Sequence, residues 1–275
     1  MELAVFEPSL YRSTVKSFLQ RHQIADVKAD YKGLGAVLEA FKEIPYENVS
    51  KLLRQKNWTG GDELLLRLPD VLWNDFQENK LGGTCYSLTF FLEVILSNLG
   101  FECYPVSADM KWGRNVHCGL AVILEGVHWW CDPGYLLMTP MVLSGKFQQV
   151  YRTESSGIQL VFDGLKYRLG TFHGREIKWR YSFIDSKCKR SNFLHYWLAS
   201  FEQRGMNGVC LTRQQKEGMI YIHNRFFKEV SRSAVRKSRL DSNWLKEIER
   251  LFGIPGILLE EAYSITKSRG KQCSR

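Results

Sequence analysis

The stretch GGTCYSLTFFLEVILSNLG, at positions 82–100, is the part of the sequence from which the fold can be inferred. From Thr84 to Leu99 it is apolar on nearly every side of a helix, and Gly100 is typical of a helix end. A helix with this pattern has to be buried, so we expect it to run through the protein core. The two glycines before it allow a close backbone approach, and Thr84 is expected to cap the helix, which makes Cys85 its first residue.

The segments on either side of this helix have different periods. Upstream, apolar residues recur at helical spacing near 10–19 and 34–41, and Pro45 interrupts the pattern. Downstream the period changes to two, which predicts antiparallel strands at 101–107, 116–124, 128–132, 160–162, 167–169 and 177–183. The remainder predicts a helix after 192, short strands at 208–211 and 218–223, and a helix from 241 to 252. Helices followed by strands and a mixed end are typical of an α+β fold.

Composition excludes several classes of protein. With 275 residues, 44% of them hydrophobic, the chain can bury a large core, which excludes a mainly disordered or collagen-like protein. No stretch approaches the roughly 20 apolar residues of a membrane span, and the acidic start does not resemble a secretory leader. The seven cysteines include no C-x-x-C pair, and no histidine has metal-ligand spacing. We therefore expect a cytoplasmic protein with no bound metal or cofactor.

The charge balance is basic, with 38 Lys+Arg against 29 Asp+Glu and a net charge of +9. Such a chain suits anionic partners, which are nucleic acid, a phosphorylated ligand or a membrane surface. Much of the excess lies in the stretch 228–239 and in a basic tail after Thr266. The stretch carries no nucleic-acid motif, so a solvated positive surface is the simpler interpretation, and neither nucleic acid nor a membrane is an expected partner.

Cys85 has the surroundings of a reactive thiol. At the first position of a helix, the free N–H groups and the helix dipole favour the thiolate, which is the nucleophilic form. The same amides can stabilise an oxyanion that develops on an acyl group under attack. Without a partner base, a small buried cysteine after a turn is the simpler interpretation.

A base and an orienting carboxylate are available on two predicted strands. If residues 125–126 form a two-residue loop, Leu124 pairs with Val127, and Asp132 lies diagonal to His117 on the same face. Diagonal neighbours lie about 7–8 Å apart at Cβ, so their side chains can meet. A three-residue loop would turn the aspartate to the other face. Together with the cysteine at the helix start, the two residues compose a nucleophile, a base and an orienting acid.

These residues occur in a pattern that resembles the arylamine N-acetyltransferases. The motif Gly-Gly-x-Cys at 82–85, the strand residue His117 and Asp-Pro-Gly-Tyr at 132–135 follow the family's order. The interval from histidine to aspartate, 132 − 117 = 15, is also the family's. EIPYENV at 43–49 resembles the family's IPFENL motif, and LFGI at 251–254 resembles the end of its C-terminal helix. The resemblance therefore runs, in order, over most of the chain.

The resemblance implies a three-lobed fold with a core like that of the cysteine proteases. Residues 1–100 would form a helical bundle that carries the nucleophile. Residues 101–190 would form an antiparallel β-barrel that carries the histidine and the aspartate. Residues 191–275 would form an α/β lid that ends in the basic tail.

The resemblance also implies an acetyl transfer in two steps. Acetyl-CoA would acylate Cys85, with His117 as the base and Asp132 as the orienting acid, and an aromatic amine or hydrazine would then take the acetyl group. Tyr46 and Tyr135 lie inside the matching motifs and are the expected substrate-binding residues.

The sequence departs from the family's pattern around the triad. Leu81 stands where the family usually has arginine, the Glu-Asn pair after the aromatic Tyr86 is missing, and Leu136 replaces a glycine. These departures leave the donor and the acceptor open. The alternatives are an amide synthase with a longer acyl donor, a transglutaminase-like or peptidase activity, and a non-catalytic binding protein on the same scaffold.

Overall fold

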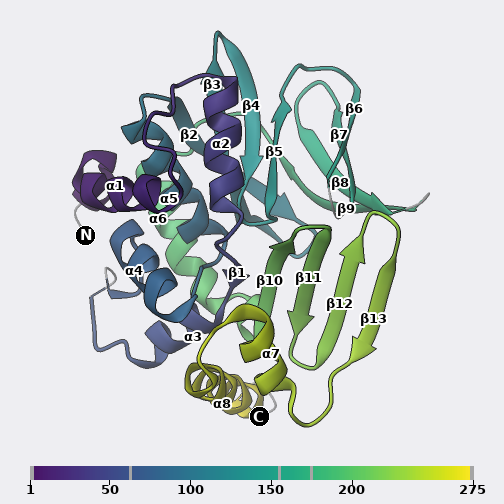
Figure 1. Cartoon of the computed structure of the whole chain (residues 1–275). Helices are drawn as coiled ribbons and strands as arrows, with labels where there is room; N and C mark the ends of the chain where they lie inside the picture. The colour runs from purple at the N-terminus through teal and green to yellow at the C-terminus, as the bar shows by residue number, and fades with distance from the viewer. Residues whose placement is uncertain (1–2, 62–63, 154–155, 174–175, 273–275) are drawn as a thin grey trace.

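The computed structural model describes residues 3–61, 64–153, 156–173 and 176–272, and its elements follow the α+β order expected from the sequence (Figure 1). The N-terminal part is helical and contains one two-residue strand, β1 (Tyr46–Glu47). Its other elements are the 3-10 turns η1 (Leu3–Phe6) and η2 (Pro8–Tyr11) and the helices α1 (Arg12–Arg21), α2 (Tyr31–Phe41), α3 (Val49–Lys56), α4 (Pro69–Asn79) and α5 (Cys85–Asn98).

Helix α5 runs through the core, as its all-round apolar pattern predicts. Every residue from Cys85 to Leu96 is buried. Rings from α1, α2 and α4 meet Phe91 on one side, with Phe18, Phe41 and Trp73 at centroid distances of 5.9, 5.7 and 6.0 Å. Helix α6 (Arg190–Ala199) packs on another side. Since each fully buried ring contributes about 1.5–3 kcal/mol, this cluster holds the N-terminus of α5 firmly in place.

The strands after α5 form an eight-stranded antiparallel sheet in the order β5-β4-β3-β2-β9-β8-β7-β6. They are β2 (Glu102–Met110), β3 (Gly113–Leu124), β4 (Val127–Asp132), β5 (Leu137–Val142), β6 (Gln148–Arg152), β7 (Gly157–Phe162), β8 (Tyr167–His173) and β9 (Glu176–Phe183). The sheet curls into a nearly closed barrel around a core that includes Trp130 and Phe183. The two end strands meet where Val142 N donates a hydrogen bond to Tyr151 Oη at 3.0 Å.

A second, five-stranded sheet has the order β1-β10-β11-β12-β13 and lies beside the barrel (Figure 1). Its later strands are β10 (Cys210–Gln215), β11 (Gly218–His223), β12 (Phe226–Ser231) and β13 (Val235–Arg239). Helices α7 (Trp244–Phe252) and α8 (Gly256–Gln272) share a hydrophobic cluster with β10, β11 and α3. Two short 3-10 turns, η4 (Ser200–Glu202) and η5 (Arg204–Met206), lead into this sheet.

Residues 228–239, interpreted as a solvated basic stretch, lie mostly in β12 and β13, and most of their side chains are exposed, which agrees with that interpretation. Two other features differ from the sequence-based expectation. The basic segment after Thr266, expected as a tail, continues α8 to Gln272, while 273–275 lie outside the described residues. Thr84 occupies the N-cap position, but its side chain makes no capping hydrogen bond. Instead, Ser87 Oγ donates to the Thr84 carbonyl at 3.0 Å.

The hydrophobic clusters do not follow the chain order of the three proposed lobes. Helix α6, which begins at Arg190, packs with the N-terminal helices. Helix α3, from the first hundred residues, packs with α7 and α8. The first two hydrophobic clusters therefore combine elements from different parts of the chain, and the limits at residues 100 and 190 stay a prediction.

Candidate active site

Two glycines place Cys85 at the start of α5. A Cβ on Gly82 would lie 1.8 Å from the Pro45 carbonyl oxygen, so only glycine fits there. Gly83 N donates to the same carbonyl at 3.3 Å, and Glu47 N donates to Gly83 O at 2.9 Å. The segment that contains β1 thus fixes the turn before the helix, and the thiol lies at the helix N-terminus, 8% exposed.

A buried arginine also supports this turn. Arg67 Nη2 donates to Gly82 O at 2.8 Å, and Nη1 pairs with Asp75. The arginine that the family resemblance would place at position 81 is absent, and Leu81 is buried in the second hydrophobic cluster. The guanidinium that contacts this turn belongs to Arg67 instead, and no pattern in the sequence predicts that contact.

His117 and Asp132 meet as the predicted hairpin requires. Leu124 pairs with Val127, so the loop has two residues. His117 Nε2 lies 2.9 Å from Asp132 Oδ2, and the aspartate is fully buried. Tyr135 N donates to Asp132 Oδ1 at 2.9 Å. Burying a carboxylate is costly unless donors surround it, so these bonds offset that cost and fix the orientation of Asp132.

Cys85 and His117 meet at Gly134. A Cβ on Gly134 would lie 2.7 Å from Cys85 Cβ and 2.9 Å from His117 Cε1. The thiol and the imidazole also share a hydrogen bond. Because Asp132 occupies Nε2 of the histidine, Nδ1 is the ring nitrogen left for the thiol. The structure therefore brings together the three residues selected from the sequence.

The electrostatics favour a thiolate beside an imidazolium. A hydrogen bond from Cys118 lowers the pKa of Cys85 most, and burial opposes it. The hydrogen bond and charge of His117 add to the decrease, so the pKa lies well below that of an ordinary thiol. Burial lowers the pKa of His117, but Asp132 and the Cys85 thiolate outweigh it and raise this pKa to about 10. The pair is therefore ionised at neutral pH.

Two neighbours of Cys85 were missed by sequence reasoning. Cys118, which follows the histidine, has its Sγ 3.5 Å from Thr89 Oγ1 and forms a hydrogen bond with Cys85. Lys51 is 5% exposed, hydrogen-bonds Ser200, and its charge lowers the pKa of Cys85. Cys118 could have been noticed because it adjoins the histidine, whereas Lys51 lies far away in sequence and has no motif.

The two expected substrate-binding tyrosines lie close to the thiol. Both are half-buried, and burial together with the charge of Cys85 raises the pKa of Tyr46 and of Tyr135. The ring of Tyr135 meets His117 edge-on at 5.1 Å. Tyr221 of β11 also interacts with both tyrosines, although the sequence gave no reason to select it.

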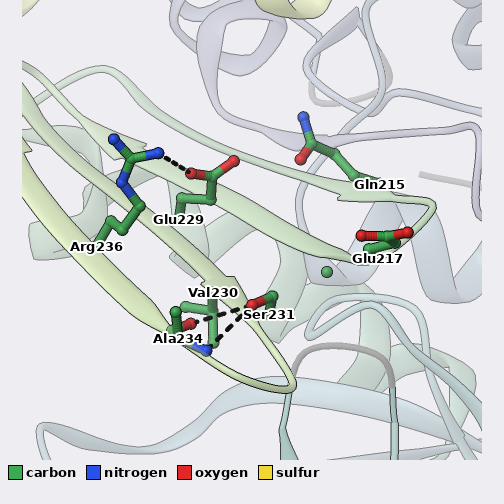
Figure 2. Close-up of a pocket in the computed structure, with 8 residues that line it drawn as sticks. Gln215, Glu217, Glu229, Val230, Ser231, Ala234 and Arg236 are labelled. Atoms are coloured by element: carbon green, nitrogen blue, oxygen red, sulfur yellow. Dashed lines mark hydrogen bonds and ion pairs between the residues drawn. The ribbon is translucent and has the colours of Figure 1, made fainter.

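Other parts of the described chain offer no competing centre. Within these residues no group of three histidines, cysteines or acids could hold a metal ion. A recess in the second sheet is lined by residues of β10–β13 and the turns between them (Figure 2). Cys85, His117 and Asp132 are not among its lining residues. No helix in the described part is both long and apolar enough to cross a membrane.

Comparisons with known proteins show the family and the fold of the chain. The sequence model of a family described as N-acetyltransferase matches residues 34–256. No curated protein sequence matches the chain. The fold is similar to that of arylamine N-acetyltransferase from Salmonella typhimurium, at 17% identity, with 93% of this chain and 98% of that chain covered and a TM-score of 0.75.

Two further solved structures have the same fold. The arylamine N-acetyltransferase of Mycobacterium marinum has 16% identity and a TM-score of 0.76, with 92% of this chain and 98% of that chain covered. That of Bacillus cereus, described as having a Cys-His-Glu catalytic triad, has 16% identity and a TM-score of 0.68, with 88% and 98% covered. The family match spans most of the chain, and the fold matches over nearly its whole length, so the chain belongs to the N-acetyltransferase family of acyltransferase enzymes.

Proposed function

We propose that the protein transfers an acetyl group from acetyl-CoA to an aromatic amine or a hydrazine through a thioester on Cys85. The contact at Gly134, where the thiol meets His117, supports this most strongly. Asp132 holds the other nitrogen of the same ring at 2.9 Å. This arrangement supplies a nucleophile, a base and an orienting acid within one buried site.

In the first step, the Cys85 thiolate attacks the carbonyl carbon of the acetyl thioester. The negative charge that develops on the carbonyl oxygen is stabilised by the backbone N–H of Cys85 at the helix N-terminus. The C–S bond to coenzyme A then breaks, and the leaving thiolate takes the proton of the His117 imidazolium. The products are an acetyl-cysteine and neutral His117.

In the second step, the amine attacks the carbonyl carbon of the thioester on Cys85. Neutral His117 accepts a proton from the attacking nitrogen, and the C–S bond to Cys85 breaks. The enzyme returns to the thiolate–imidazolium pair, which Asp132 stabilises by its hydrogen bond to Nε2. Tyr46 and Tyr135 would line the acceptor site beside the thiol, since both are half-buried next to it.

Steady-state kinetics test the proposed thioester route, because it requires the two steps to occur in a fixed order. Initial rates of acetyl transfer from acetyl-CoA to p-anisidine or to phenylhydrazine should give parallel double-reciprocal lines, because one product leaves before the second substrate reacts. The Cys85→Ala variant should transfer no acetyl group to either acceptor. Intersecting lines, or transfer retained in Cys85→Ala, would contradict the thioester route.

A further inference from the structure

A second thiol, that of Cys118, lies against the face of α5 that begins with Cys85. Thr89 comes four residues after Cys85 on this helix, so the two side chains lie on the same face, one turn apart. Cys118 Sγ is 3.5 Å from Thr89 Oγ1, and the same hydroxyl donates to the Cys118 carbonyl at 3.4 Å. Thr89 therefore holds both the side chain and the backbone of Cys118 one turn from Cys85.

The thiols of Cys85 and Cys118 also form a hydrogen bond with each other. Cys118 follows His117 on β3, and both cysteines belong to the hydrophobic cluster around α5. Cys118 is fully buried, whereas Cys85 retains a small exposed surface. A reagent from solution can therefore reach Cys85, and Cys118 is placed to react with a group that forms on Cys85.

The two thiols differ in their protonation. The pKa of Cys85 is lowered, most of all by the hydrogen bond from Cys118, and Cys85 is a thiolate. Burial first, and then the hydrogen bond and charge of Cys85, raise the pKa of Cys118 well above that of an ordinary thiol, so Cys118 keeps its proton. Burial also raises the pKa of the four other described cysteines, which are Cys103, Cys131, Cys188 and Cys210. Among the described cysteines, Cys85 is therefore the one that an electrophilic oxidant attacks.

A thiol beside a thiolate changes the outcome of cysteine oxidation. A hydroperoxide oxidises a thiolate to a sulfenic acid, and a neighbouring thiol can condense with that acid to give a disulfide. Where no thiol is within reach, oxidation continues to the sulfinic and sulfonic acids, which ordinary thiols do not reduce. The steps of the proposed acetyl transfer do not use the sulfur of Cys118, whereas this chemistry requires a sulfur at that place.

We propose that Cys85 and Cys118 form a reversible disulfide when a small hydroperoxide oxidises Cys85, with Cys118 as the resolving cysteine. The pair is then a modification site, and its disulfide form cannot carry an acyl group. A disulfide joins its two sulfurs at about 2.05 Å, so the Sγ atoms have to close from hydrogen-bond distance. This assignment concerns the two thiols alone and does not depend on the acyl donor or the acceptor.

The reaction takes two steps. In the first, the Cys85 thiolate attacks one oxygen of the hydroperoxide, the S–O bond forms and the O–O bond breaks, and the departing oxygen takes the proton of the His117 imidazolium. In the second, the sulfur of Cys118 attacks the sulfur of Cys85, the S–O bond breaks, and the hydroxide takes the Cys118 proton and leaves as water. The hydroperoxide gains two electrons, and the two cysteines together lose two.

Cys188 provides a matched control, because it is near Cys118 and more accessible. Ser107 pairs with Cys118 in the register of β2 and β3, so their side chains share one face, and Ser107 Oγ donates to Cys188 Sγ at 3.1 Å. Cys188 is half-buried and is therefore the competing candidate for the resolving cysteine. Cys118→Ser removes the sulfur and keeps a hydrogen-bond donor beside Thr89, whereas Cys188→Ala leaves the proposed pair intact.

Intact mass and peptide mapping after treatment with hydrogen peroxide test the assignment directly. Wild-type protein and Cys188→Ala should become about 2 Da lighter, with the Cys85 and Cys118 peptides joined, and dithiothreitol should restore the mass. Cys118→Ser should instead gain about 16 Da, captured by dimedone at Cys85, and then about 32 Da, which dithiothreitol does not reverse. A wild type that gains oxygen at Cys85 without forming this disulfide, or a disulfide lost in Cys188→Ala, would overturn the assignment.

Acylation by acetyl-CoA separates this assignment from the proposed function. Peroxide-treated wild type should take no acetyl group until dithiothreitol restores the reaction, whereas Cys118→Ser oxidised at Cys85 beyond the sulfenic acid should not recover. If the untreated wild type is not acylated, the proposed function fails, and the mapped disulfide still decides the assignment. Urea unfolding checks that each variant is folded, and Cys118→Ala is a second variant that should behave as Cys118→Ser.

Discussion

The hydroxyl of Tyr181 donates a hydrogen bond to Oδ2 of Asp132, the same oxygen that lies 2.9 Å from His117 Nε2. Trp130 Nε1 in turn donates to the Tyr181 hydroxyl at 3.0 Å. The barrel core therefore holds the aspartate in the orientation that the histidine needs. Tyr181 acts through Asp132 and is a positioning residue.

Tyr181→Phe tests this relationship. We expect a loss of about 1–3 kcal/mol in unfolding free energy, because Trp130 Nε1 loses its acceptor, and about a tenfold slower acylation of Cys85. Tyr167→Phe is the matched control. Its hydroxyl accepts from Gly145 N at 3.1 Å in the same barrel, away from Asp132, so it should lose stability but no acylation rate. Urea unfolding and single-turnover acylation measure the two effects, and equal acylation rates in both variants would contradict the positioning role.

Gly134→Ala should separate Cys85 from His117. The added methyl group would lie 2.7 Å from Cys85 Cβ and 2.9 Å from His117 Cε1, so one of the two side chains has to move. We expect acylation to fall about a hundredfold, because a displacement of about 1 Å in a catalytic contact has an effect of that size. Gly35→Ala, which meets no atom within 4 Å inside α2, should keep full activity and gain about 0.5–1 kcal/mol of stability. Full activity in Gly134→Ala would contradict the proposed contact.

The pH dependence of alkylation tests the ion pair. The lowered pKa of Cys85 keeps the thiolate present as the pH falls, and the pKa of His117, raised to about 10, keeps the imidazolium present as the pH rises. The rate of Cys85 alkylation by iodoacetamide should therefore change little between neutral pH and about pH 9, whereas an ordinary thiol reacts about tenfold faster per unit up to about pH 8.5. In His117→Gln the rate should rise steeply with pH. A steep profile in the wild type would show that the pair is not ionised.

The same pair links folding stability to pH. A histidine whose folded pKa is raised contributes stability that is complete below about pH 6.5 and is lost as the pH rises through about 10. The cysteine, whose folded pKa is lowered, contributes stability that is lost as the pH falls through that pKa. The two contributions offset each other up to about pH 8.5, where an ordinary thiol ionises, so His117→Gln should lose less stability than the wild type between about pH 8.5 and about pH 10, measured by urea unfolding. Parallel stability curves for the two proteins over this interval would contradict the linkage.

Lys51→Met tests the buried cation near the thiol. Removing the charge should raise the pKa of Cys85 and slow its alkylation at about pH 6 by a few-fold. Stability should change little or rise, because replacing a buried charge by an apolar chain of similar length removes a desolvation cost. Lys56→Met, on the same helix but in an exposed pair with Glu261, is the control and should alkylate like the wild type. Alkylation equal to that of the wild type in Lys51→Met would show that this charge does not act on the thiol.

The parts of the site that depend on local sequence were predictable. The apolar pattern of α5 placed Cys85 at a buried helix start, and the two-residue loop placed Asp132 within reach of His117. Both inferences use distances of a few residues along the chain. Helix periodicity and hairpin register are determined at that range.

The parts that depend on pairing between distant segments were not predictable. Arg67 supports the turn before Cys85 from a distant position in the chain, through its hydrogen bond to Gly82 O. Lys51, on α3, is also distant in sequence, and its charge lowers the pKa of Cys85. The stretch 228–239 has the charges of a solvated surface, yet it pairs in register with Tyr221 and extends the second sheet. A single sequence does not encode such pairings in a local pattern, so they become visible only in the sheet.

The central claim is that Cys85 carries the acetyl group. Intact mass spectrometry of the protein mixed with acetyl-CoA in the absence of an acceptor tests it most directly. The account predicts one added acetyl group on the wild type and none on Cys85→Ala. An unmodified wild type, or the same adduct on both proteins, would contradict it.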